Sequence, residues 1–244
     1  MAQATLTAAS ALQAKSGFER GGPISVTLDA ACQEGSTVII ELYGGQINIM
    51  DGGMGGQIPD GFSLDACSAS SDNAVKYLYS FRKAGVAAGE QSWSFDQSAA
   101  PLDWIWHATE WNADLEPISP LEGFSGLWQT SGAGSPGATF STGTAPPTGN
   151  TGRANVVALG YHHWHRSSGA DTFGWGTTFT GGFTERDRIS WTSPVTLRHR
   201  DVWSWAFGTA VGQYGTALDL SWNSTLNADT WASMVVIYAA TTYA

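Results

Sequence analysis

The sequence predicts an all-β protein, an antiparallel β-sandwich of jelly-roll type with a short N-terminal arm. Three observations predict this class. The 244 residues include 30 glycines and 12 tryptophans, and only 13% are charged, which favours short strands and loops over long helices. Apolar and aromatic residues recur at every second position in many short runs. Clusters of Gly, Pro, Ser and Thr separate those runs. We expect an arm over 1–23 and a single sandwich domain over 24–244.

The first half begins with an alanine-rich stretch, 4–16, which could form a short helix although its apolar pattern is poor. Alternate residues of a strand share a face. Tyr77, Tyr79 and Phe81 are therefore expected on one face of their strand, and Trp104 and Trp106 on one face of theirs. The strands expected in this half cover 23–28, 36–45, 75–83, 92–96 and 102–111.

The second half has the same texture. The segment 131–152 is rich in Gly, Ser, Thr and Pro, so it is either a linker or two loops around an edge strand at "ATFSTG". The last run is apolar at successive positions from Met234 to Tyr238, which predicts a strand covered on both sides. The further strands expected cover 154–165, 171–182, 188–200, 201–208, 217–222 and 230–240.

Charge and cysteine content narrow the function classes. The net charge of −10 argues against a nucleic-acid partner, because phosphate binding needs clustered Lys and Arg. No run of 18 apolar residues predicts a membrane span, and residues 1–22 lack the basic region and apolar core of a signal peptide. We expect synthesis in the cytoplasm and no membrane insertion. Cys32 and Cys67 could form a disulfide, but their spacing does not require one.

Residues 160–168, "GYHHWHRSS", contain three of the five histidines in the chain. On a strand, His163 and His165 lie on one face, and His162 and Trp164 on the other. An H-x-H pair can supply two imidazole ligands to zinc or iron. Two ligands do not complete a metal site, and the alternative is the polar end of a strand. We expect the strand end, with no metal and no cofactor.

Carboxylate pairs offer a second chemistry. A glycosidase needs two carboxylates facing across a sugar, and the spacing of Glu185 and Asp187 puts both on one strand face. The adjacent Arg186 and Arg188 favour a surface strand with ion pairs instead. Neither a G-x-S-x-G nucleophile motif nor a P-loop occurs. The sequence therefore predicts no catalytic residues and a protein that is not an enzyme.

Tryptophan suggests a binding role, because exposed indole rings stack on sugars. Most of the tryptophans belong to W-x-W patterns typical of a buried sheet face. Trp164 and Trp175, which flank a Gly/Ser-rich loop, are the candidates for carbohydrate binding.

The order of segments carries a resemblance. "STVIIELYG" precedes a glycine-rich loop, then "VKYLYSFRK", "SWSFD" and "LDWIWHATEWNADLEPIS". Later "FSTGTAPPTGNTGRANVVALGYH" leads to the closing "LDLSWNSTLNADTWASMVVIYAA". This order, spanning 24–240, resembles a β-sandwich domain of minor tail and other virion proteins of phages that infect actinobacteria. The same domain recurs in some bacterial surface proteins.

The resemblance implies a single jelly-roll-like sandwich with a structural role, no cofactor and no catalytic residues to transfer. We therefore expect a bacteriophage virion protein, a minor tail or tail-tip component exposed to the host surface. It would assemble with itself and with other virion proteins. The alternatives are a head decoration protein and a carbohydrate-binding module that contacts host cell-wall glycan.

Overall fold

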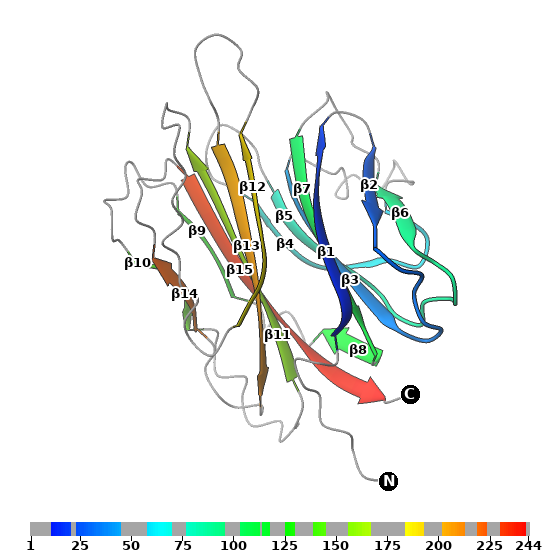
Figure 1. The fold of residues 1–244 in the computed structure, drawn as a ribbon. Coiled ribbons are helices and arrows are strands. Elements are labelled where there is room, and N and C mark those ends of the chain that lie inside the picture. Colours follow the sequence, from blue (N-terminus) through cyan, green and yellow to red (C-terminus); the bar gives the residue numbers. More distant parts are fainter. Residues whose placement is uncertain are drawn as a thin grey trace, which may run out of the picture.

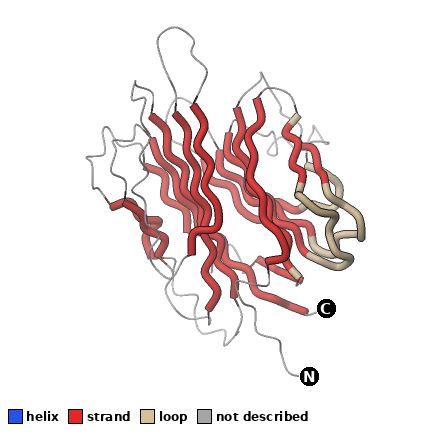
Figure 2. The backbone as a smooth tube through the Cα atoms, in the orientation of Figure 1, coloured by secondary structure: helices blue, strands red, loops and turns tan. Residues whose placement is uncertain are grey.

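The structure is a computed structural model, and every regular element in the part that it describes is a β-strand (Figure 2). The all-β class predicted from the period-two pattern is confirmed, and the pairings are antiparallel. Within the described residues no helix is long and apolar enough to cross a membrane. The described residues are 11–20, 23–44, 58–69, 77–95, 103–112, 114–117, 125–129, 139–144, 156–166, 184–192, 202–212, 219–223 and 230–242.

The strands of the first half are β1 (Ala11–Arg20), β2 (Ile24–Thr27), β3 (Thr37–Gly44), β4 (Ser63–Ala69), β5 (Tyr77–Lys83), β6 (Ser92–Phe95), β7 (Asp103–Trp111) and β8 (Asp114–Pro117). Those of the second half are β9 (Ser125–Gln129), β10 (Thr139–Thr144), β11 (Val156–Arg166), β12 (Thr184–Thr192), β13 (Val202–Gly212), β14 (Asp219–Asn223) and β15 (Thr230–Thr242).

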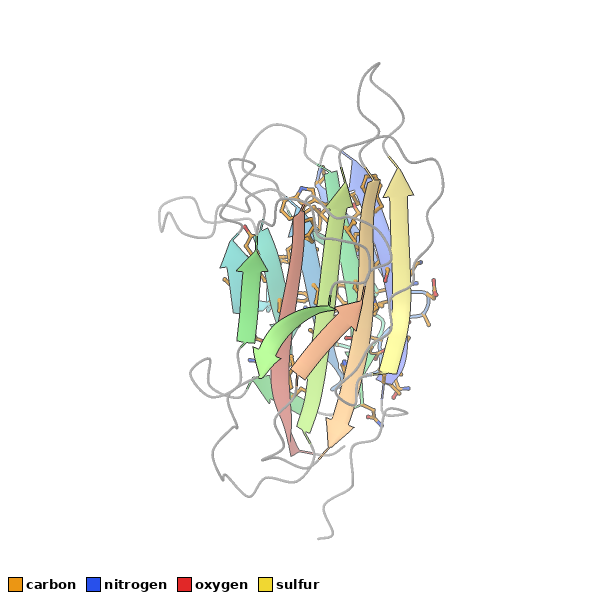
Figure 3. All side chains as sticks on the ribbon, turned by 90° about the vertical axis from the view of Figure 1, so that its left-hand side faces the viewer. Atoms are coloured by element: carbon orange, nitrogen blue, oxygen red, sulfur yellow. The ribbon has the colours of Figure 1, made fainter. Side chains whose placement is uncertain are left out.

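These strands form two large sheets and two strand pairs. The five-stranded sheet has the order β1-β7-β3-β5-β4, and the six-stranded sheet has β12-β13-β11-β15-β8, with β9 also on β15. β2 pairs with β6, and β10 with β14. Figure 1 shows them in layers: β10 and β14 at the left, then the six-stranded sheet, the five-stranded sheet, and β2 with β6. The two large sheets face each other, and Figure 3 looks through the six-stranded one onto the other.

The main apolar core of the described residues lies between the five-stranded sheet and the β2–β6 pair. The expected faces are correct here: Tyr79, Phe81, Trp104 and Trp106 all point into this core. The Phe81 and Phe95 rings lie 5.0 Å apart between centroids, so aromatic contacts join the two layers. The other buried members are Ile24, Val26, Leu28, Cys32, Val38, Ile40, Leu42, Val86, Trp93 and Ala108.

The short helix that the sequence allowed over 4–16 does not form in the described part of that stretch. Residues 11–20 form β1, an edge strand that pairs with β7 from Ala11↔Trp111 to Arg20↔Asp103. Helix propensity of an alanine-rich stretch is a weak preference, and hydrogen bonding to a strand far along the chain overrides it here.

Other strand predictions have mixed outcomes. β15 pairs with β11 at one edge and with β8 and β9 at the other, so it is an interior strand of its sheet; that both of its faces are covered stays a prediction. β10 covers all but the first residue of "ATFSTG" and ends one residue later at Thr144, so 131–152 is not simply a linker. β4, β8 and β9 were not predicted, and 171–182 lies outside the described residues.

Candidate functional site

A row of polar residues crosses the five-stranded sheet on the face toward the six-stranded sheet. The registers pair Ser16 of β1 with His107 of β7, His107 with Glu41 of β3, and Glu41 with Ser80 of β5. Directly paired residues share a face, so these four form one line, which we call the polar row. His107, Glu41 and Ser80 are 0% exposed. Buried polar groups are costly unless they bond to one another, so their partners define what the row does.

At the β1 end of the row, the Ser16 hydroxyl lies 2.5 Å from His107 Nδ1. Serine, histidine and a carboxylate are the residue types of an acyl-transfer triad. Here, however, His107 and Glu41 are completely buried beneath the second sheet, and Ser16 is part-buried. A substrate would not reach the imidazole, so this arrangement serves to bind β1 to β7.

At the other end, the row continues into the six-stranded sheet. Tyr238 of β15 is 0% exposed, and its Oη lies 3.0 Å from Ser80 Oγ. Tyr238 also hydrogen-bonds to Asp65, whose Oδ2 accepts from Arg82 Nε at 3.0 Å. Asp65 falls at a register irregularity of β4, between Leu64 and Ala66. A bulge re-aims the side chain of its extra residue, which explains how Asp65 joins this cluster.

Burial and charge set the protonation of this cluster. Burial raises the pKa of the Asp65 carboxyl, while the Arg82 charge and its hydrogen bond partly oppose the rise. Burial, and then the charge of Asp65, raises the pKa of Tyr238 well above its usual value. Tyr238 is therefore a neutral phenol that donates to Asp65 and accepts from Ser80. The cluster connects the two sheets by polar contacts.

Another buried carboxylate, Glu110 of β7, fixes the start of β1. Its Oε2 accepts from Gln13 Nε2 at 2.5 Å, and its Oε1 accepts from the backbone N–H of Gln33 at 2.7 Å. Gln13 also exchanges two 3.1 Å bonds with the Ala30 backbone. Cys32 beside this network is a free thiol, and burial, with the charge of Glu110, raises its pKa to about 12. The Cys32–Cys67 disulfide that the sequence left open therefore does not form.

The histidine cluster lies at the end of β11, with strands on both sides. His162, His163 and His165 are paired with β13 and with β15. The pairing has no irregularity there, so His163 and His165 occupy one alternating set of positions and His162 the other. Among the described residues, no group of three or more His, Cys, Asp or Glu could hold a metal.

The sugar-binding candidates are only partly placed. Trp164 lies on β11, where it pairs with Ser204 and Trp231. Trp175 lies outside the described residues.

The expectation that Glu185 and Asp187 share a face is wrong. The β12–β13 register shifts between them, so Glu185 pairs with Gly208 and Asp187 with Phe207. Consecutive positions of a strand alternate in face, so the backbone register does not place these two residues on one face. The irregularity removes the geometric basis for reading them as a glycosidase pair.

The polar row and the Asp65–Tyr238 cluster were not predicted from the sequence. A signal for part of it was present: Glu41 interrupts the apolar run "TVIIELYG", and His107 interrupts "DWIWHATEW". A charged or titratable residue inside a buried strand needs a partner there.

No family model, curated protein or solved structure matches the chain.

Proposed function

We propose that the chain is a structural protein of a bacteriophage virion, a minor tail or tail-tip component exposed to the host surface. Its architecture would be a jelly-roll-like β-sandwich, and it would assemble with itself and with other virion proteins. It would act without a cofactor and would not be an enzyme.

One observation carries the proposal. The segments that resemble the virion domain coincide with strands β3, β5, β6, β7, β11 and β15 wherever they are described. Those strands lie in facing antiparallel sheets or in the layer beside them, which is the arrangement that a sandwich requires (Figure 1). Supporting this, the row and the cluster bond to neighbouring protein groups, as expected of a rigid scaffold.

Mass spectrometry of purified virions tests the proposal. Particles of the phage that encodes the chain should contain several copies of it. The number of copies per copy of the major tail or head protein should stay the same after the particles are washed with salt. The copy number would also distinguish a tail-tip component from a head decoration protein. A decoration protein is present in proportion to the repeating subunits of the capsid. Absence from purified particles would contradict the proposal.

A second candidate function is binding of host cell-wall glycan within the same particle. The favouring observation is that Trp164 and Trp231 occupy directly paired positions on β11 and β15. Two neighbouring tryptophan positions suit stacking on successive sugars. Saturable binding to isolated cell walls that falls on Trp164→Ala, Trp231→Ala or Trp175→Ala would support it, and binding unchanged in all three variants would remove it.

A further inference from the structure

The strand β1 ends the five-stranded sheet. Its inner edge pairs with β7 from Ala11 to Arg20, with a register irregularity between Ala11 and Gln13, and within the described residues no strand pairs with its outer edge (Figure 1). An edge strand presents a row of backbone N–H and C=O groups on which another strand can add. Leu12, the exposed large apolar side chain among the described residues, also lies on β1.

Side-chain contacts hold β1 in one conformation before any partner arrives. Ser16 bonds to His107, and Gln13 bonds to Glu110. Gly17 lies so close to Trp106 that an added Cβ would collide with the indole carbons. A strand fixed in this way loses little conformational entropy when a second strand pairs with it.

The charges of β1 are complementary to themselves. Lys15 and Glu19 lie two residues before and two residues after Gly17. If two copies of β1 pair antiparallel about a two-fold axis at Gly17, each Lys15 faces the Glu19 of the other copy. Lys15 also contacts Asp29 of its own chain at 2.7 Å. An ammonium group has three donors, so the one group can serve both carboxylates.

We propose that two copies of this chain associate through β1, antiparallel and about a two-fold axis at Gly17. The partner is a second copy, because an isologous two-fold contact joins one self-complementary surface to itself, and the charges of β1 complement themselves in this way. The pairing would extend each five-stranded sheet into a continuous sheet of both copies. This interface is the surface through which the chain would assemble with itself, so the inference rests on the self-assembly in the proposed function.

Charge exchange on the full-length chain tests this interface. Lys15→Glu places like charges opposite each other twice, and so does Glu19→Lys. Each variant alone should weaken self-association roughly tenfold or more by light scattering over a concentration series. An equimolar mixture of the two variants should associate as tightly as the wild type, because every glutamate of one variant then faces a lysine of the other. Asp29→Asn is the matched control for Lys15→Glu. Like that variant, it removes the ion pair between Lys15 and Asp29 within one chain, but it should leave association unchanged.

The outcomes separate this interface from the proposed function. Weakened single variants with a restored mixture would support pairing through β1. A wild-type oligomer whose mass is the same in both variants would overturn it, while the virion role would stand. A wild type that is monomeric at all concentrations would also overturn it. The virion role would then depend on the mass spectrometry of particles alone.

Discussion

The contact between the two sheets can be tested at a single oxygen atom. Tyr238→Phe removes the hydroxyl that joins Ser80 and Asp65 and leaves the ring in place, so no large cavity forms. A hydrogen bond between neutral groups contributes about 1 kcal/mol and one to a carboxylate about 1.5–3 kcal/mol. Asp65 keeps Arg82 as a partner. We therefore expect the variant to lose about 2 kcal/mol of unfolding free energy.

Urea unfolding followed by tryptophan fluorescence measures this loss. Thr27→Val is the matched control, since it removes a hydroxyl–hydroxyl contact of the same 3.0 Å length, with Ser92, at an exposed position. The control should cost less than about 0.5 kcal/mol, because water replaces an exposed bond. Equal losses in Tyr238→Phe and Thr27→Val would refute the view that this polar contact stabilises the packing of the two sheets.

The pH dependence gives the same test a second readout. The folded pKa of Tyr238 is raised, so its contribution to stability is present below the unfolded value of about 10 and is lost as the pH rises further. Tyr238→Phe should lack this alkaline loss. Its bond to Asp65 favours the ionised carboxyl, so the cost of the substitution should be smaller near pH 4 than at pH 7. A cost independent of pH would contradict the bond to Asp65.

Three further substitutions or reactions probe other contacts. Gly17→Ala should lower the free energy of unfolding, measured in urea, by about 1–3 kcal/mol, because the added Cβ collides with Trp106. The loss should be smaller in a Trp106→Phe background, and additive losses would contradict the collision. The hydrogen bond from Lys83 lowers the pKa of Glu90. Glu90→Gln should therefore lose about 0.5–1 kcal/mol of unfolding free energy at pH 7, and progressively less as the pH falls below about 4. A loss that does not change with pH would refute the ion pair. Cys32 has a pKa of about 12 and is buried, so peptide mapping should find it unmodified by iodoacetamide at pH 8 until urea unfolds the chain; rapid alkylation of the native protein would contradict its burial.

Much of the strand content could be predicted from local pattern. The alternation in "SWSF" and "DWIWHATEW" identifies both the strands and the faces they bury. β1 and β4 were missed because "ALQAKSGFER" and "SLDACSA" have no clean alternation. Such strands form because a partner distant in sequence supplies their hydrogen bonds, and no local window contains that partner.

Two residues of the candidate site had a signal in the sequence, but its geometry had none. Glu41 and His107 are visible as polar residues in apolar runs, yet their alignment depends on the register between β3 and β7. Register irregularities are hidden in the same way. One brings Asp65 into its cluster, and another falls between Glu185 and Asp187. A shift of one residue reverses the face of every side chain beyond it, so spacing alone cannot settle which carboxylates meet.

The register of β1 connects the polar row to the proposed dimer. A strand with so few apolar residues gains little from burial, and many registers would compete. Only the observed one places Ser16 against His107 and Gly17 beneath Trp106. A slip of one residue would put Ser16 or Phe18 opposite Trp106, where a Cβ does not fit. The polar contact and the missing Cβ therefore select one register, and the proposed two-fold axis at Gly17 requires that register because it holds the flanking charges in fixed places.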